Sequence, residues 1–332
     1  MHPDPKTQRE PAAKRRIEAL DLARGLALLA MAIYHFAWDL EFFGYAPPGM
    51  TAVGGWKLFA RCIASSFLFL VGVSLVVAHG RGIRWPGFLR RLAMIIAAAA
   101  AISAVTYVAV PDAFIFFGIL HQIALASLLG LAFLRLPPLL TLAAAAFVIA
   151  LPLLFRSTIF DHPALLWLGL FESRPRSNDY VPLFPWFGAV LAGIALAGMA
   201  AAAGLFDRLA TIRFGRWSTP LQFIGRHSLA FYLIHQPVLI GAVWLFSQML
   251  PPAIQPPEVR FRASCEATCA QERDAAFCTR YCACMLGELE TTGDLPSIFA
   301  GRQDEDLRER VSGMAGLCTA RAEDNELEDT AP

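Results

Sequence analysis

Long apolar runs separated by short polar breaks fill most of the first 250 residues of the chain. A membrane-spanning helix needs about 20 consecutive, mostly apolar residues. Seven segments meet this requirement: 20–43, 56–79, 92–111, 113–134, 136–155, 183–203 and 221–250. The pattern therefore predicts an all-α polytopic membrane bundle of about seven transmembrane helices.

Two stretches depart from this simple pattern. The apolar run 163–171 is too short to span a bilayer, so we expect a re-entrant or interfacial piece there. Pro237 lies near the middle of the long last segment, where a proline is expected to kink the helix.

Charged residues divide the chain into two kinds of sequence. The whole chain is 56% hydrophobic and 17% charged, with a formal net charge of +1, whereas soluble domains are about 25% charged. Residues 259–332, in contrast, hold 15 Asp and Glu against 8 Arg. We therefore expect a cytoplasmic N-terminal segment at 1–19, a transmembrane domain at 20–250 and a separate tail at 251–332. The N-terminal segment is polar and proline-rich, and it does not resemble a cleavable signal peptide.

The positions of Lys and Arg predict the orientation of the bundle, because cytoplasmic loops carry an excess of them. If the N-terminus is cytoplasmic, the basic residues on the outer side are Lys57, Arg61, Arg156, Arg174 and Arg176. The cytoplasmic set is larger: Lys6, Arg9, Lys14, Arg15, Arg16, Arg81, Arg84, Arg90, Arg91, Arg135, Arg208, Arg213 and Arg216. We therefore expect a multi-pass protein of the cell inner membrane with a cytoplasmic N-terminus and an extracytoplasmic C-terminal tail. The basic residues follow this topology rule, and nothing suggests a nucleic-acid partner.

The tail contains six of the seven cysteines. Their order is Cys-x3-Cys, eight residues, then Cys-x3-Cys, whereas zinc ribbons use Cys-x2-Cys pairs. A spacing of four places both thiols of a pair on one face of a helix, and a turn near Asp274 brings the two pairs into register. The sequence thus predicts a disulfide-bonded helical hairpin in an oxidising compartment, without a metal. The predicted bridges are Cys265–Cys282, Cys269–Cys278 and, as a possible third, Cys284–Cys318. A metal site in a cytosolic tail is the alternative.

Ionisable residues lie within the first apolar segment. Inserting such a group is costly, by about 2.5–3.5 kcal/mol for an Arg or Asp, so its presence indicates function. Asp21, Arg24, His35 and Asp39 share this segment. At 100° and 1.5 Å per residue, Arg24 and His35 lie about 20° apart around the helix axis and about 16 Å apart along it. Asp39 follows His35 by one turn, so we expect its carboxylate to orient the imidazole. The alternative is that Asp21 and Arg24 form an interfacial pair at the helix end.

Other segments repeat this theme. Arg226 and His227 should lie near the cytoplasmic side, where they could bind a phosphorylated ligand. His121 and His235 lie in the fourth and seventh segments and, with His35, predict a polar cavity; interhelical hydrogen bonds are the alternative for both. Asn178 and Asp179 are expected at the outer mouth of the sixth segment.

Several of these residues lie in stretches that resemble the catalytic domain of the heparan-alpha-glucosaminide N-acetyltransferase family. The resemblance covers roughly residues 16–245 and rests on six stretches: Arg16–Ala27 with Met31 and His35, Phe67–Ser74, Gly118–Ala124, Pro185–Gly188, Ile224–Leu229 and Tyr232–Pro237. Arg24 and His35, with ten residues between them, also match the first-helix pattern of the broader acyltransferase-3 superfamily.

The resemblance implies a membrane-bound acyltransferase that takes an acyl group, usually acetyl, from cytoplasmic acetyl-CoA. The acceptor would be a sugar amine or hydroxyl of a glycan or other molecule on the far side of the bilayer. His35 would be the general base or an acyl-carrying nucleophile, oriented by Asp39. Arg24 and Arg226 would bind the phosphates of coenzyme A or polarise the thioester carbonyl, so that Arg24 also counts as catalytic. His227 would contribute to coenzyme A binding. The acceptor cavity would be lined by His121 and His235, with Asn178 and Asp179 at its outer mouth.

Three alternatives remain open at this point. The membrane-embedded histidines could ligate a b-type haem between helices, or the polar stripe could serve a transporter. The bundle could also be a non-catalytic scaffold that anchors the cysteine-rich tail.

Overall fold

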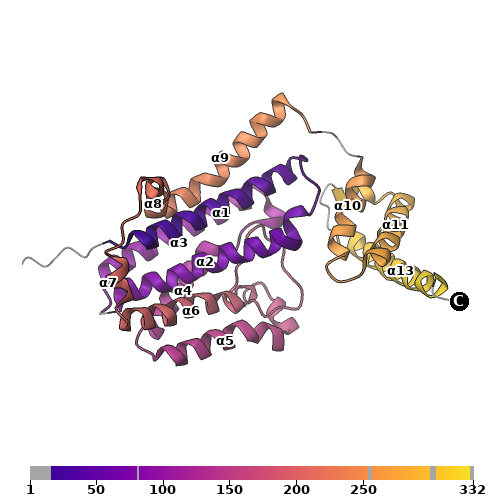
Figure 1. Cartoon of the computed structure of the whole chain (residues 1–332). Coiled ribbons are helices and arrows are strands. Elements are labelled where there is room, and N and C mark those ends of the chain that lie inside the picture. Colours follow the sequence, from indigo (N-terminus) through magenta and orange to yellow (C-terminus); the bar gives the residue numbers. More distant parts are fainter. Residues whose placement is uncertain (1–15, 81, 253–255, 300–303, 330–332) are drawn as a thin grey trace, which may run out of the picture. The chain divides into compact units, whose positions relative to one another are not determined.

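The computed structural model describes residues 16–80, 82–252, 256–299 and 304–329 of the chain. Within these ranges the chain forms helices and no strands (Figure 1), which confirms the all-α prediction. Five of the predicted cytoplasmic residues lie outside the described ranges: Lys6, Arg9, Lys14, Arg15 and Arg81.

The apolar helices follow the predicted order. They are α1 (Glu18–Phe42), α2 (Gly54–His79), α3 (Trp85–Ala109), α4 (Ile119–Phe133), α5 (Pro138–Leu154), α6 (Leu183–Ala202) and α9 (Ser228–Met249). Among the described residues, five helices are long and apolar enough to cross a membrane, namely α1, α2, α3, α6 and α9. Helices α4 and α5 are apolar but have only 15 and 17 residues. The seven expected segments are therefore seven apolar helices, two of them shorter than the sequence indicates.

Helix α4 is short because its expected first turns are not helical. After α3 the chain forms a 3-10 turn at Pro111–Ala113 and then runs extended to Gly118. The loop before α6 holds this stretch: the backbone N–H of Asn178 bonds the carbonyl of Ala113 at 3.0 Å, and that of Val181 bonds Phe117 at 3.1 Å. Backbone groups paired with another segment cannot also continue a helix.

The last apolar segment contains an interruption that the sequence did not predict. It divides at His227 into α8 (Thr219–Arg226) and α9, and α9 continues through Pro237. The apolar run at 163–171 contains only a 3-10 turn at Leu166–Leu168. A further short helix, α7 (Leu205–Leu209), follows α6.

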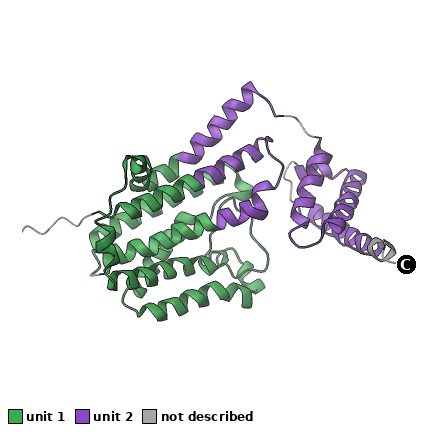
Figure 2. Cartoon of the chain, viewed as in Figure 1, with its two compact units in different colours: residues 1–30, 62–234 green, residues 31–61, 235–332 purple. Residues whose placement is uncertain are grey.

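The chain divides into two compact units, residues 1–30 with 62–234 and residues 31–61 with 235–332 (Figure 2). In the first unit α4 packs against α3 and α6, and α5 packs against α6. The core there includes Leu68, Val190 and Leu191, all fully buried. Helices α2 and α6 approach backbone to backbone, because a Cβ added at Gly72 would lie 2.1 Å from the carbonyl oxygen of Val190. Small residues at such crossings are typical of helix packing in membranes.

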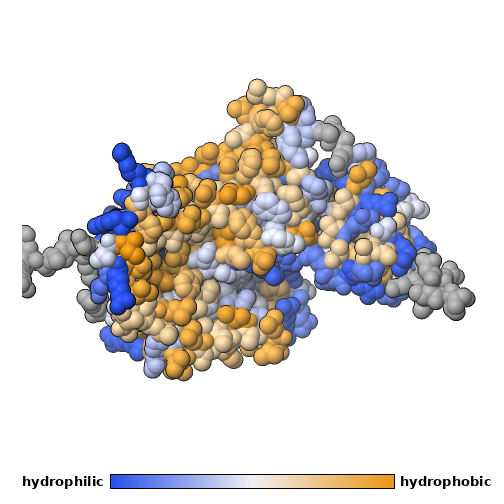
Figure 3. Space-filling model, in the orientation of Figure 1, coloured by the Kyte–Doolittle hydropathy of each residue, from blue (hydrophilic) through white to orange (hydrophobic). Residues whose placement is uncertain are grey.

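The outer surface of the first unit is strongly apolar. Val108 and Leu154 are each 83% exposed, and Leu153 is 79% exposed. Hydrophobic residues cover most of the visible face of the bundle, and hydrophilic residues gather at the end that carries α7 (Figure 3). An outer surface of large apolar side chains is expected where lipid, and not water, surrounds the bundle.

In the second unit, the loop after α1 is anchored by one carboxylate. The two Glu41 oxygens accept hydrogen bonds from the backbone N–H groups of Gly49 and Thr51 and from the Thr51 hydroxyl, the last at 2.7 Å. The hydroxyl of Tyr34 bonds the carbonyl of Thr51 at 3.3 Å. This loop therefore has a defined conformation next to the end of α1.

The tail of the second unit is a small helical domain held by disulfides. Its helices are α10 (Pro257–Cys269), α11 (Ala275–Thr292), α12 (Leu295–Phe299) and α13 (Glu305–Asp329). The structure contains the three bridges that the cysteine spacing predicts: Cys265–Cys282, Cys269–Cys278 and Cys284–Cys318. The first two join α10 to α11 as rungs of a hairpin, and the third attaches α13. The expected hairpin is thus extended by a further packed helix, over a core that contains Leu289 and Met314.

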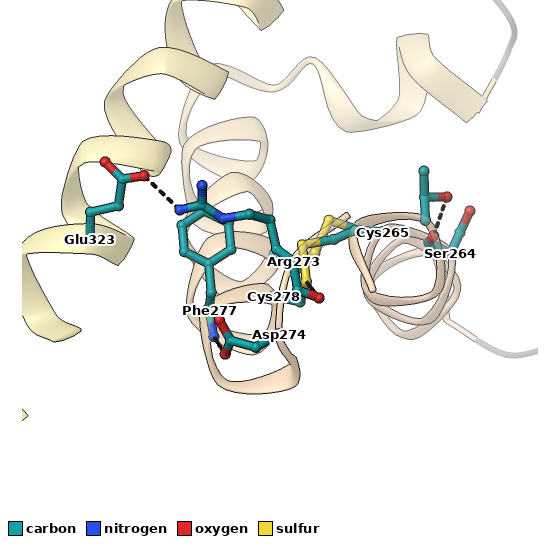
Figure 4. The surroundings of a disulfide bond; sticks show 10 residues. Ser264, Cys265, Arg273, Asp274, Phe277, Cys278 and Glu323 are labelled. Atoms are coloured by element: carbon teal, nitrogen blue, oxygen red, sulfur yellow. Dashed lines mark hydrogen bonds and ion pairs between the residues drawn. A yellow bond between two sulfur atoms is a disulfide. The ribbon is translucent and has the colours of Figure 1, made fainter. Parts of the chain in front are cut away.

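Polar contacts define the ends and faces of these tail helices (Figure 4). Asp274 caps α11 by accepting the N–H of Phe277 at 2.9 Å, and this bond holds the pKa of its carboxyl below the usual range. Arg273 lies over the Phe277 ring, 4.1 Å from its centroid, and pairs with Glu323 of α13 at 2.6 Å. The turn predicted near Asp274 is therefore the point where α10 ends and α11 begins.

Candidate functional site

Asp21 organises the first polar cluster, at the N-terminal end of α1. Its side chain is only 5% exposed and lies 2.7 Å from Arg16, 3.4 Å from Arg24 and 3.9 Å from Arg226. Arg24 also donates to the hydroxyl of Ser74 on α2 at 2.7 Å. A buried carboxylate needs such partners. The cluster brings Arg24 and Arg226 together around Asp21, so the positive charges of both are compensated by a carboxylate of the protein itself.

Two glycines allow α1 and α8 to approach closely beside this cluster. A Cβ added at Gly25 would lie 2.0 Å from the carbonyl oxygen of Leu221, and one at Gly225 would lie 1.9 Å from that of Asp21. Real Cβ atoms essentially never come so close to backbone oxygens. The helix break at His227 therefore leaves a short α8 packed directly against α1, with Arg226 in its last turn.

A small cavity of about 20 Å³ opens beside Ser74, where α2, α3 and α4 meet. Arg91 of α3 and His79 of α2 line it. Arg91 is exposed and makes no ion pair with any described residue, and it is close enough to Arg24 for their charges to repel. A neighbouring cavity of about 150 Å³ shares His79 and is lined also by Arg135. Cationic side chains without an internal anion suit a phosphorylated ligand.

A second polar cluster lies in the other unit, where α1 and α9 meet. The rings of His35 and His235 have centroids 5.0 Å apart at an interplanar angle of 61°. His235 is buried, and His35 is half-buried. Tyr34 lies against the His35 ring edge-on, with centroids 5.8 Å apart. Two histidines predicted from separate motifs are thus direct neighbours.

The predicted role of Asp39 as the residue that orients His35 requires correction. One Asp39 oxygen accepts a hydrogen bond from the side-chain amide of Gln236 at 2.7 Å. The other oxygen has no hydrogen-bond partner among the described residues, so the carboxylate makes no hydrogen bond to His35. Asp39 is fully buried. Gln236 lies on α9, 197 residues further along the chain. The two side chains therefore form a polar pair of their own beside the two histidines.

His121 and Asp179 come together at the beginning of α4. The backbone N–H of Ile119 donates to Asp179 at 2.8 Å, and that of Gly118 donates to Nδ1 of His121 at 3.2 Å. The Nε2 atom of His121 lies 3.2 Å from the hydroxyl of Ser103. The first N–H groups of a helix have no intrahelical partner, so these contacts cap α4. Burial raises the pKa of the Asp179 carboxyl to about 6.

The remaining candidate residues are more isolated. Asn178 is exposed, and its backbone belongs to the segment that pairs with Ala113. His227 is exposed and bonds the carbonyl of Phe223 at 3.0 Å. Within the described residues it forms no ion pair with the cluster around Asp21. In the part of the chain that the structure describes, no three His, Cys, Asp or Glu side chains are grouped to hold a metal ion.

Two glutamines to which the sequence assigned no role, Gln122 and Gln236, also have buried polar atoms. Gln122 is fully buried, and neither atom of its amide finds a hydrogen-bond partner among the described residues. Both glutamines directly follow a histidine that the motifs single out. A polar neighbour on an otherwise apolar helix was the signal available for them.

The fold and these clusters define a multi-helix membrane protein with polar groups inside an apolar bundle. Residues 16–237 match the family model described as heparan-alpha-glucosaminide N-acetyltransferase, catalytic. The chain therefore belongs to this family, which supports a membrane acetyltransferase-like role, and the resemblance seen in the motifs is confirmed. No curated protein and no solved structure matches the chain.

Proposed function

We propose that this chain is a membrane-bound acyltransferase that moves an acyl group, most simply acetyl, from acyl-CoA to a sugar amine or hydroxyl across the bilayer. One observation carries the proposal. Helix α1 holds Arg24 beside the cavity lined by Arg91 in its first half, and in its second half it holds His35 in ring contact with the buried His235. The same helix can therefore contribute to the binding of the acyl donor and to the chemical step.

The arginine-lined cavities support a role in binding coenzyme A. Arg91 and Arg135 present cationic side chains around them, while His79 and Ser74 add an imidazole and a hydroxyl. Coenzyme A carries a diphosphate and a ribose phosphate, which basic side chains bind through charge-assisted hydrogen bonds. Its pantetheine arm is long and extended, so the thioester can lie well away from the phosphates. Arg24 and His35 are separated by about 16 Å along α1 at 1.5 Å per residue, a span that such an arm can cover.

His35 would act as the general base. Its imidazole accepts a proton from the acceptor nitrogen or oxygen as that atom attacks the carbonyl carbon of the thioester. The carbon–sulfur bond then breaks, the coenzyme A thiolate leaves, and the imidazole returns the proton to sulfur. The products are an amide or ester and free coenzyme A. Since a thioester is already activated, proximity and a base suffice, and the base contributes about 10²–10⁴ in rate.

The tail supports the proposed orientation of the molecule. Three disulfides in one small domain are typical of an oxidising compartment. This agrees with the distribution of basic residues, which favours a cytoplasmic N-terminus and an extracytoplasmic tail. The acyl donor would then be cytoplasmic and the acceptor extracytoplasmic, in the cell inner membrane.

The test is transfer of radiolabelled acetyl from acetyl-CoA by the purified full chain, comparing wild type with His35→Ala. We expect turnover in the wild type and its loss in His35→Ala. His162→Ala is the matched control, because His162 lies in an exposed loop, and it should retain full activity. Retained activity in His35→Ala, at an unchanged size-exclusion profile, would remove His35 from the mechanism. If the wild type shows no turnover and does not bind coenzyme A, the proposed function itself is overturned.

A further inference from the structure

Asp39 and Glu41 are two carboxylates near the end of α1, and they differ in how many of their oxygens accept hydrogen bonds from the protein. Both Glu41 oxygens accept hydrogen bonds from the loop at Gly49 and Thr51. Asp39 is fully buried, yet only one of its oxygens has a partner, the side-chain amide of Gln236. The second oxygen, Oδ2, has no hydrogen-bond partner among the described residues. Glu41 therefore fixes the loop, whereas Asp39 has one buried oxygen that can still accept a hydrogen bond.

Gln236 shows the same incompleteness. Its amide nitrogen donates to Asp39, but its buried amide oxygen, Oε1, has no partner in the described part of the chain. The pair thus presents two buried oxygen atoms that can only accept hydrogen bonds. A buried acceptor without a donor is costly, and a buried carboxylate without a cation is more so. No described Lys, Arg or His forms an ion pair with Asp39.

The chemistry of this pair specifies what would complete it: a group with several N–H donors and a positive charge. A protonated primary amine has three such donors and compensates the charge of the carboxylate. Hydroxyl groups supply a donor but no charge. The position is suitable as well, because Asp39 lies one turn beyond His35 and near the end of α1 at Phe42.

We propose that Asp39 and Gln236 form the acceptor subsite of this enzyme, in which their free oxygens bind the amine of an amino sugar beside His35. This inference rests on the proposed function and adds to it the residues that recognise the acceptor. The amine binds as an ammonium ion and releases one proton to water. The neutral nitrogen then keeps N–H groups for the two oxygens while its lone pair is free to attack the thioester.

The test is a set of initial-rate measurements with the purified full chain in nanodiscs, varying acetyl-CoA and glucosamine independently. Asp39→Asn keeps the shape of the side chain and removes its charge, and Gln236→Met keeps the length and removes the amide. We expect the KM for glucosamine to rise roughly tenfold to a hundredfold in Asp39→Asn, and about twofold to tenfold in Gln236→Met. The KM for acetyl-CoA should stay within about twofold of wild type in both.

Two controls keep the result specific. Thr141→Val removes another buried polar group, whose hydroxyl bonds the carbonyl of Pro137, the residue before α5, and no other described residue. This variant should match wild type. Methyl glucoside replaces the amine acceptor with hydroxyls, and the Asp39→Asn effect should be several-fold smaller with it, because a hydroxyl carries no charge to be compensated.

Each outcome has a defined meaning. Wild-type turnover with an unchanged glucosamine KM in both variants overturns the subsite but leaves the proposed function standing. Equal increases in KM for both substrates also overturn it. If the wild type shows no turnover, the proposed function fails, and glucosamine binding is then measured directly by calorimetry. Binding that is lost in Asp39→Asn supports the subsite, and binding that is equal in wild type and variant overturns it.

Discussion

Gly25 and Gly225 lie where α1 and α8 cross, each against the backbone of the other helix. A Cβ at Gly25 would lie 2.0 Å from the carbonyl oxygen of Leu221, and one at Gly225 would lie 1.9 Å from that of Asp21. The carbonyls belong to helix backbones and cannot rotate away as a side chain can. This crossing places Arg226 within reach of Asp21.

The close crossing predicts that Gly25→Ala and Gly225→Ala each destabilise the protein, by about 1–3 kcal/mol, because the helices must separate to admit a methyl group. Thermal unfolding in detergent measures the effect as a lower Tm. Gly241→Ala is the control, since no atom lies within 4 Å of a Cβ added there in α9. An equal loss of Tm in Gly241→Ala and Gly25→Ala would contradict this account of the crossing.

Arg91 is predicted to bind the phosphates of coenzyme A, because it lines the cavity beside Ser74 and has no ion-pair partner among the described residues. Arg91→Ala should weaken coenzyme A binding roughly tenfold to a hundredfold in a calorimetric titration. Arg90→Ala provides a matched control, since Arg90 precedes Arg91 on α3 and lines neither cavity. Similar affinities for the two variants would remove Arg91 from the binding site.

Asp179 predicts a pH dependence of stability. Burial raises the pKa of its carboxyl from 3.8 to about 6. Between about pH 4 and pH 6 the folded protein therefore binds more protons at this group than the unfolded chain does, so its contribution to stability falls as the pH rises. The total change is up to about 3 kcal/mol.

The measurement is Tm against pH for wild type and Asp179→Asn. The isosteric amide can still accept the N–H of Ile119, but it does not titrate, so the part of the slope due to Asp179 should vanish. Asp112→Asn, at an exposed position in the preceding loop, should leave the wild-type slope in place. Identical slopes for wild type and Asp179→Asn would show that this carboxyl titrates normally.

The Cys284–Cys318 bridge is predicted to contribute most among the three disulfides. It closes a loop with a sequence separation of 34, against 9 for Cys269–Cys278. Loop-closure entropy makes these worth about 4 and about 3 kcal/mol. Replacing Cys284 and Cys318 together by serine should therefore speed limited proteolysis of the tail by at least about tenfold.

Cys62→Ser is the control for that experiment, because Cys62 is exposed and forms no disulfide. It should be cleaved at the wild-type rate. A tail that resists protease equally with and without the Cys284–Cys318 bridge would show that its helical core is sufficient for stability.

Local patterns in the sequence predicted the helices and the disulfide register. A long apolar run predicts a membrane helix without any knowledge of the helices that it packs against. The order of α1 to α6 and α9 therefore follows from the sequence. The cysteine register follows from a spacing of four and a turn, and Asp274 caps α11 at that turn. The ends of the helices were less predictable. Helix α4 begins at Ile119 because Asp179, 60 residues further along the chain, caps it.

The polar site was predictable only in part. The sequence predicted a polar cavity formed by His35, His121 and His235, and it placed Asp179 at the outer mouth of the sixth segment. The structure pairs His35 with His235 and places His121 beside Asp179 at the start of α4. The partner of Asp39 could not be predicted from spacing. The i, i+4 spacing suggested His35 on the same helix, but Asp39 bonds Gln236, which lies on α9.

The sequence by itself determined which segments are helical and apolar, which cysteines can pair, and which polar residues lie inside the bundle. Each of these depends on composition and on the period of a single helix. Only the tertiary structure decided that Asp39 bonds Gln236 and that Arg91, unlike Arg90, lines a cavity. Neighbouring residues point about 100° apart around a helix. Which of them meets a partner therefore depends on how distant helices pack, and local sequence does not encode that choice.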